Sequence, residues 1–306
     1  MWKFKLMTPI KQFIYLIFIC ICPFSLKGQT VENALLWKIE GNGLQRSSYI
    51  LGTYHLVNNT FLNNLKGCEL ALKKTSSVLG ELEITPEVAS QMMPFMIMEN
   101  SSLDSIMNPS QYDSLSRFVQ DKLGLPMVVF NKMKPIGIYL MLSAVELKNT
   151  PFLSNYKGEP MDVYVQNKAK KHGKEVYALE TIQDQADLLF NQVALNEQVQ
   201  LLMQYIKAGK QESNIENDRM NNCYMNQDLN CLDSLMNTSG FNAIESNLLL
   251  KDRNIRWIPR IEEIIKKQSC FIAVGALHLS GENGLIFLLR KQGYTLSPVH
   301  SRKHVN

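Results

Sequence analysis

Two short segments of the chain share a pattern that can place an imidazole at the end of a buried strand. One is Gly52-Thr53-Tyr54-His55, and the other is Gly275-Ala276-Leu277-His278. Each follows an apolar run, and in each the histidine is followed by a leucine. Neutral imidazoles bind divalent metals and act as general bases. Two of them at matched positions are therefore candidates for the catalytic or metal-binding side chains of one site.

Acidic side chains occupy similar strand ends. We expect residues 77–84 to form a strand, on which Glu81 and Glu83 share one face because side chains alternate along a strand. Glu180 follows another expected strand, and Asp162 opens an expected helix. Each of the four also has a purely structural interpretation, since acids are common on sheet rims and at helix N-termini.

The elements that must position these side chains alternate between strands and helices at both ends of the chain. Strands are predicted at 35–40, 48–54, 77–84, 175–179, 270–274 and 294–299. Amphipathic helices are predicted at 62–74, 251–267 and 281–292, around a mostly helical stretch at about 86–250. This order predicts the α/β (α+β) class. The central β-sheet would consist of two pseudo-symmetric halves, each carrying a Gly-x-x-His motif, with a helical insertion in the middle.

The repeat indicates where a site would lie. In open α/β sheets, ligands bind beyond the carboxyl ends of the strands. Gly52 and Gly275 remove a side chain at a point where the backbone bends or another group approaches closely. If the two halves meet around an axis, His55 and His278 face one crevice. A single histidine after a strand is usually structural, so the argument depends on the two matched contexts.

Composition limits the functional classes. The chain has 306 residues, of which 45% are hydrophobic, enough for one large domain or two modest ones. Its 32 basic and 28 acidic residues nearly balance, and no long basic run follows the first dozen residues. The sequence therefore gives no support for nucleic-acid binding.

Residues 1–28 have the form of a secretory signal. Lysines precede a short apolar run at 13–24, which is too short to span a bilayer because a span needs roughly 20 residues. Cleavage would leave 29–306 as a single domain that is exported to the periplasm or secreted. An uncleaved leader would tether the protein, and this is the one membrane contact that we expect.

Cleavage would leave four cysteines, and an even number in an exported chain permits disulfides. Cys223 and Cys231 lie close together in an Asn-rich stretch and are the expected pair. The sequence contains no Cys-x-x-Cys pattern, so a zinc ribbon or a thioredoxin-like redox site is unsupported.

In combination, the motifs resemble the TraB/GumN family, which is related to the Tiki proteins and more loosely to the erythromycin-esterase-like and ChaN-like proteins. The resemblance covers residues 35–299. Besides the two Gly-x-x-His motifs, it is carried by Leu36-Trp37-Lys38-Ile39-Glu40-Gly41, Glu81-Leu82-Glu83, Gly158-Glu159-Pro160-Met161-Asp162, Leu179-Glu180-Thr181, Arg253-Asn254 and Gly281-Glu282-Asn283-Gly284. Tiki-like members are regarded as metal-dependent proteases that use both motifs and an acid. The resemblance thus implies His55, His278 and Glu81 as the core of the site.

The leading hypothesis is metal-dependent, peptidase-like hydrolysis. His55 and His278 would be ligands, Glu81 the third ligand or the general base, and Arg253 a stabiliser of developing negative charge. The mixed nitrogen and oxygen ligands would suit zinc, manganese or cobalt. The secondary site candidates are Glu83, Glu180, Asp162, Gly52 and Gly275.

Two alternatives stay open. In a metal-independent hydrolase, His55 or His278 would act as a general base paired with Glu81. In a non-catalytic envelope protein, the crevice would bind a ligand without turnover, and Met92, Met93 and Met96 could form its wall. The substrate would be a peptide or a small molecule, and the sequence indicates no oligomeric state.

Overall fold

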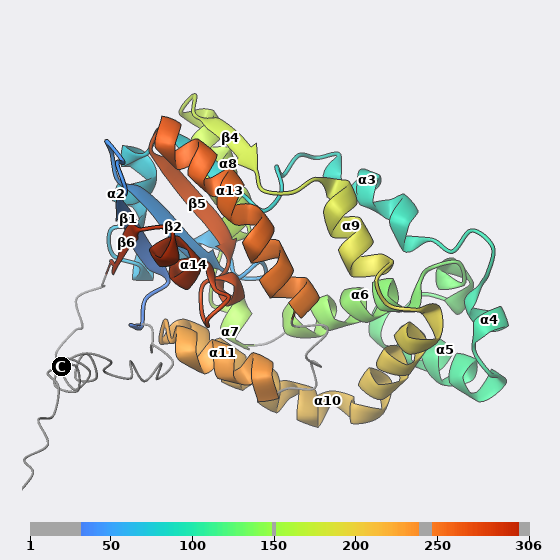
Figure 1. Ribbon diagram of the computed structural model, residues 1–306. Helices are drawn as coiled ribbons and strands as arrows, with labels where there is room; N and C mark the ends of the chain where they lie inside the picture. Colours follow the sequence, from blue (N-terminus) through green and yellow to red (C-terminus); the bar gives the residue numbers. More distant parts are fainter. Residues whose placement is uncertain (1–31, 149–150, 239–246, 300–306) are drawn as a thin grey trace, which may run out of the picture. The chain divides into compact units, whose positions relative to one another are not determined.

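Six strands form one mixed sheet in which the strands of the two Gly-x-x-His motifs lie side by side. The computed structural model describes residues 32–148, 151–238 and 247–299 (Figure 1). The strand order is β4-β3-β5-β2-β1-β6. The strands are β1 (Leu36–Gly41), β2 (Ser48–Thr53), β3 (Ser77–Gly80), β4 (Glu175–Ala178), β5 (Cys270–Gly275) and β6 (Tyr294–Pro298). The predicted α/β class is therefore confirmed.

The four strands from β4 to β2 run parallel, and β1 lies antiparallel between β2 and β6. β5 pairs with β2 on one side and with β3 on the other. Its residues Cys270–Val274 are all buried, as expected for a parallel strand that is covered on both faces. The carboxyl ends of the three strands β2, β3 and β5 consequently lie at one edge of the sheet.

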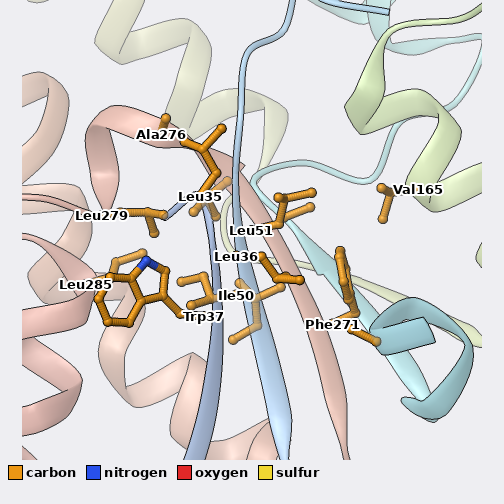
Figure 2. Close-up of a cluster of buried hydrophobic side chains, with 14 of the residues drawn as sticks. Leu35, Leu36, Trp37, Ile50, Leu51, Val165, Phe271, Ala276, Leu279 and Leu285 are labelled. Atoms are coloured by element: carbon orange, nitrogen blue, oxygen red, sulfur yellow. The ribbon is translucent and has the colours of Figure 1, made fainter. Parts of the chain in front are cut away.

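Helices cover both faces of the sheet. α8 (Met161–Lys171) packs on β3, β4 and β5, while α14 (Leu285–Lys291) packs on β6 and against α13 (Asp252–Lys267). Figure 2 shows Leu279 and Leu285 on one side of the strands and Val165, from α8, on the other. A single apolar core therefore joins the strands to both helical layers.

A second apolar core lies in the helical middle. The helices of this middle stretch are α3 (Val88–Met92), α4 (Leu103–Ile106), α5 (Pro109–Leu123), α6 (Pro135–Lys148), α7 (Pro151–Ser154), α9 (Ile182–Phe190), α10 (Leu195–Met225) and α11 (Leu229–Thr238). Short 3-10 turns η2 (Met93–Met96) and η3 (Met127–Phe130) lie among them. The second core is lined by α4, α5, α6 and α10, whereas α7 and α11 contribute to the core of the sheet. The buried methionines are Met98, Met107, Met127 and Met203, whereas Met93 is exposed. The helical insertion is thus confirmed, with β4 and α8 returning from it to the sheet.

Three predicted elements differ from those found. The helix expected at 62–74 is divided into η1 (Asn59–Asn64) and α2 (Cys68–Lys74) by Gly67, whose φ of +85° breaks the helix. The strand expected at 77–84 ends at Gly80. The helix expected at 281–292 begins only at Leu285. Pseudo-symmetry of two half-sheets stays a prediction, since strand order alone does not establish it.

Cys223 and Cys231 form the expected disulfide, and Cys68 and Cys270 are free and buried. Within the described ranges, no helix combines the length and apolar character needed to cross a membrane. The expected signal at 1–28 lies outside the described residues. Residues Val31–Asn306 form one compact unit.

Candidate functional site

Both histidines follow directly from the carboxyl ends of β2 and β5. The two strands are in register from Tyr49 with Phe271 to Thr53 with Gly275, so their Gly-x-x-His motifs start at the same edge. After β5, the chain turns through the short η5 (Ala276–His278). The sequence prediction that the two imidazoles approach each other therefore agrees with the geometry.

His278 is buried and held in one tautomer by Asn254. The amide nitrogen of Asn254 donates to the carbonyls of His278 (3.2 Å) and Asn283 (2.8 Å), which fixes its oxygen toward the ring. That oxygen lies 2.7 Å from Nδ1 of His278 and can only accept, so Nδ1 carries the proton. The lone pair on Nε2 is consequently left for another partner. Trp257 packs on the ring with the two centroids 4.4 Å apart.

His55 is held in the same way by an acid. Its Nδ1 lies 2.7 Å from Oδ2 of Asp162, near the start of α8, and donates a proton to it. The opposite nitrogen, Nε2, faces Glu81 at 4.0 Å. In contrast to His278, the His55 side chain is 62% exposed, so it forms the solvent side of the site. Asp162, expected only as a secondary candidate, orients this ring.

Glu81 lies between the two rings. Its Oε1 accepts a hydrogen bond from the Gly275 N–H at 2.8 Å and lies 3.9 Å from Nε2 of His278. Its Oε2 accepts from Arg253 at 2.6 Å and from Gln185 of α9 at 3.4 Å. Each carboxylate oxygen thus has its own set of partners, and Oε1 is the one directed toward both imidazoles.

Arg253 links the acids to the buried histidine. Its Nε donates to both oxygens of Glu180 (3.0 and 3.2 Å), and Nη2 bonds both Glu180 and Glu81. Nη1 lies 3.1 Å from Nε2 of His278, the nitrogen that carries the free lone pair. Arg253 and Glu180 are both buried, so this is a desolvated charge network at the base of the site.

The electrostatics separate the roles of the three central groups. Burial opposes ionisation of Glu81, but the positive charges of His55 and Arg253 and the hydrogen bond from the Gly275 N–H hold its pKa well below the usual range of a glutamate. Burial lowers the pKa of His278 to about 3, which keeps this ring neutral. For His55, desolvation by the surrounding protein acts in the same direction, but its side chain is mostly exposed, and the carboxylates of Asp162 and Glu81 outweigh this effect and raise the pKa to about 9.

The two motif glycines serve different purposes. A Cβ on Gly52 would lie 2.8 Å from Cδ1 of Leu279 and 2.9 Å from Cα of Ala276, so this glycine permits close packing of the two motifs. A Cβ on Gly275 would lie 3.3 Å from Oε1 of Glu81 and 3.8 Å from Nε2 of His55. Gly275 therefore leaves open the space between the central side chains.

Glu83 does not share the position of Glu81, and the expected same-face arrangement is wrong. β3 ends at Gly80, so neither acid lies on the strand and alternation no longer applies. Gln166 of α8 fixes the departing chain by bonding the carbonyl of Leu82 and the N–H of Ile84. Glu83 is left half-exposed and forms an ion pair with Lys170.

Sequence reasoning missed the contacts of Asn254, Gln185 and Trp257. Asn254 follows Arg253 directly, and Trp257 lies one helical turn after Arg253. Arg253, Asn254 and Trp257 therefore share the buried face of α13. A polar pair on the apolar face of an amphipathic helix was the available signal for Asn254. Gln185 gave no such signal, because α9 carries several polar residues.

The donor chemistry of the site fits a divalent metal ion. Two imidazoles present Nε2 while their Nδ1–H groups are held by an amide oxygen and a carboxylate, the usual support of metal-binding histidines. The separations of 3.9 and 4.0 Å from Oε1 of Glu81 are wider than the roughly 3.4 Å between ligands of a tetrahedral zinc site. As the side chains lie, no group of three or more histidines, cysteines or acids among the described residues could hold an ion. Binding would thus require a contraction of about 0.5 Å.

Comparisons with known proteins agree with the resemblance drawn from the motifs. The chain is 24% identical to Metalloprotease TIKI2 of Danio rerio over 90% of this chain and 62% of that protein. It is 24% identical to Metalloprotease TIKI1 of the same species, over 90% of this chain and 66% of that protein, and to Metalloprotease TIKI1 of Xenopus tropicalis, over 88% and 62%. The chain therefore spans slightly less than two thirds of the length of these relatives. No solved structure gives a significant match. A model of the TraB/PrgY/gumN family matches residues 35–298, and the chain belongs to the TraB/PrgY/gumN family.

Proposed function

We propose that the protein is a metal-dependent hydrolase of peptidase type. One observation carries the proposal: two imidazoles from opposite ends of the chain turn Nε2 toward the same oxygen of Glu81, while their Nδ1–H groups are held by Asn254 and Asp162. The names of the Danio and Xenopus relatives, which are metalloproteases, support the assignment of peptide substrates.

His55, His278 and Glu81 would hold the ion, which would be zinc, manganese or cobalt. Such an ion polarises a carbonyl and lowers the pKa of a bound water from 15.7 to about 7. Glu81 fits a ligand better than a general base, because its lowered pKa makes it a weak proton acceptor at neutral pH. His55 must lose a proton from Nε2 before it binds an ion, since its pKa of about 9 keeps both nitrogens protonated at neutral pH.

The buried side chains of the site support these three. Asn254 keeps His278 in the tautomer that presents Nε2, and Asp162 turns the His55 ring toward Glu81. Arg253 is shared between the carboxylates of Glu180 and Glu81 and compensates part of the charge of each. The exposed edge of His55 leaves the solvent side of the site open to a substrate.

The test is a metal assay of purified protein beside a His55→Ala/His278→Ala double variant, with His172→Ala as control. His172 lies at the end of α8 and its ring contacts the Lys168 carbonyl instead. We expect about one equivalent of divalent metal in the wild type and the control, none in the double variant, and loss of peptide hydrolysis after chelation. Full activity in the presence of a chelator would contradict metal dependence.

That outcome would favour a second candidate, a metal-independent hydrolase. The specific observation behind it is the His55–Asp162 contact of 2.7 Å, which resembles the base-orienting pair of other hydrolases. In this case His55→Ala would abolish chelator-resistant activity. Double substitution of both histidines without any functional loss in cells would instead favour a non-catalytic binding protein.

The proposal includes export to the periplasm or beyond, since residues 1–28 have the composition of a signal. N-terminal sequencing of the protein isolated from cells tests this part. A mature terminus near residue 29 is expected, and an intact leader would indicate tethering instead.

A further inference from the structure

The guanidinium of Arg253 contacts two of the three groups that the proposed function assigns to the metal. Nη2 lies 2.6 Å from Oε2 of Glu81, and Nη1 lies 3.1 Å from Nε2 of His278. Nη1 also donates to the carbonyl of Leu249, and Nε is bound to Glu180. The cation therefore binds the outer carboxylate oxygen of Glu81 and the free nitrogen of His278 at the same time, beside the 3.9 Å gap between Oε1 and that imidazole.

The contact with His278 cannot coexist with a bound ion. A neutral imidazole has one nitrogen lone pair, and Asn254 fixes the proton on Nδ1, which leaves only Nε2 as an acceptor. In this structure that lone pair faces the Nη1–H of Arg253. A metal ligated by Nε2 would also place a double positive charge beside a guanidinium in a site where water screens poorly.

Arg253 has a partner that lets it withdraw without losing its charge compensation. Glu180 receives Nε and Nη2, and neither Glu180 nor the Leu249 carbonyl belongs to the proposed ligand set. Trp257 supports the guanidinium from one face, with 4.7 Å between its centre and the ring centroid. A guanidinium that left Glu81 and His278 would thus keep its bonds to Glu180 and its contact with Trp257.

We infer that Arg253 is a competitor of the metal: its guanidinium binds Nε2 of His278 and Oε2 of Glu81 and must move onto Glu180 before an ion binds. This inference depends on the proposed function, because it needs a metal site. Arg253 is then a positioning residue that sets metal affinity. Removal of the Arg253 guanidinium should tighten metal binding, whereas loss of an ordinary supporting residue weakens metal binding about 10- to 100-fold.

The experiment is a calorimetric titration of metal-free protein with Zn²⁺ and, separately, Mn²⁺. Arg253→Met keeps much of the apolar stem on Trp257 and removes the competing donors. We expect its affinity for at least one ion to rise tenfold or more over the wild type. Arg256→Met is the matched control, since Arg256 is an exposed arginine of the same helix, and its affinity should equal that of the wild type. Circular dichroism of each variant verifies the fold.

A second measurement does not depend on a variant that folds. The side-chain ¹⁵Nε–H resonance of Arg253 in wild-type protein should shift on addition of one equivalent of Zn²⁺, and the resonance of Arg256 should not. Equal or weaker metal binding by folded Arg253→Met, or an Arg253 resonance that Zn²⁺ leaves unchanged while calorimetry shows binding, would overturn the inference and leave the metal site intact. Absence of metal binding by wild type, Arg253→Met and Arg256→Met alike would overturn the proposed function and this inference together.

Discussion

Alanine substitutions of the two motif glycines should affect different properties, stability at Gly52 and metal affinity at Gly275, because an added methyl group meets different neighbours at the two positions. At Gly52, a Cβ would lie 2.9 Å from Cα of Ala276 and 2.8 Å from Cδ1 of Leu279. The first neighbour is backbone and cannot rotate away. Overpacking of this kind costs about 1–3 kcal/mol, and the rigid neighbour places Gly52→Ala at the upper end. For a chain of this size, that corresponds to a fall in Tm of roughly 5 °C.

At Gly275, the added methyl group would meet side chains and no backbone, and it would enter the space between the central side chains. Its contacts would be 3.3 Å to Oε1 of Glu81, 3.7 Å to Cδ2 of His278 and 3.8 Å to Nε2 of His55. The contacts with the two imidazoles are ordinary packing distances, whereas the contact with Oε1 requires the Glu81 carboxylate to shift by a few tenths of an ångström. Gly275 does not have a positive φ, so we expect a stability loss of about 1 kcal/mol, smaller than that of Gly52→Ala. Zn²⁺ affinity should nevertheless fall by about tenfold or more, since the ligands cannot contract around an ion.

Denaturant unfolding and calorimetric Zn²⁺ titration of both variants separate the two effects. The expected pattern is a clearly destabilised Gly52→Ala and a less destabilised Gly275→Ala that binds metal poorly. Equal stability losses in the two variants would refute the assignment of packing to one glycine and ligand space to the other. Wild-type Zn²⁺ affinity in Gly275→Ala would refute the location of the site.

Three further outcomes follow from the described contacts. Glu81→Gln should lower the free energy of unfolding by about 3 kcal/mol and abolish metal binding, because charged hydrogen bonds within a buried network are lost; the same change at half-exposed Glu83 should cost below about 1 kcal/mol in chemical denaturation. Asp162→Asn should lower the pKa of His55 from about 9, as measured by NMR titration of metal-free protein, and an unchanged value would exclude Asp162 as the cause. Cys231→Ser opens a disulfide between residues 8 apart in sequence and should cost roughly 2–3 kcal/mol in thermal unfolding, whereas an unchanged Tm would show that the crosslink is dispensable.

The sequence predicted the frame of the site better than its supporting contacts. Apolar runs followed by Gly-x-x-His located β2 and β5, and the rule that sites lie beyond strand ends placed His55 and His278 together. The alternation argument for Glu81 failed at the next step. Alternation holds only inside a strand, and β3 ends at Gly80, where the side chain of Gln166 from a distant helix takes over the backbone bonds.

Contacts between distant segments account for most of what sequence reasoning missed. Asp162 looked like a residue that complements a helix N-terminus, and only the packing of α8 on the sheet reveals its bond to His55. Arg253 was expected to face developing charge, but its position between Glu81 and His278 depends on how α13 packs over the sheet. A one-dimensional pattern contains no information about which helix face meets which strand end.

The position of β5 between β2 and β3 has a consequence for synthesis of the protein. β2 and β3 come early in the chain, yet each completes its hydrogen bonding only when the segment Cys270–Gly275 arrives near the end. Pairings so remote in sequence form late, because a long loop must close first. A polypeptide interrupted before residue 270 would hold two unpaired strand edges and an imidazole without its counterpart. The proposed metal site should therefore form in one step once the segment from residue 270 onward is added, and prematurely terminated chains should be prone to associate through those edges.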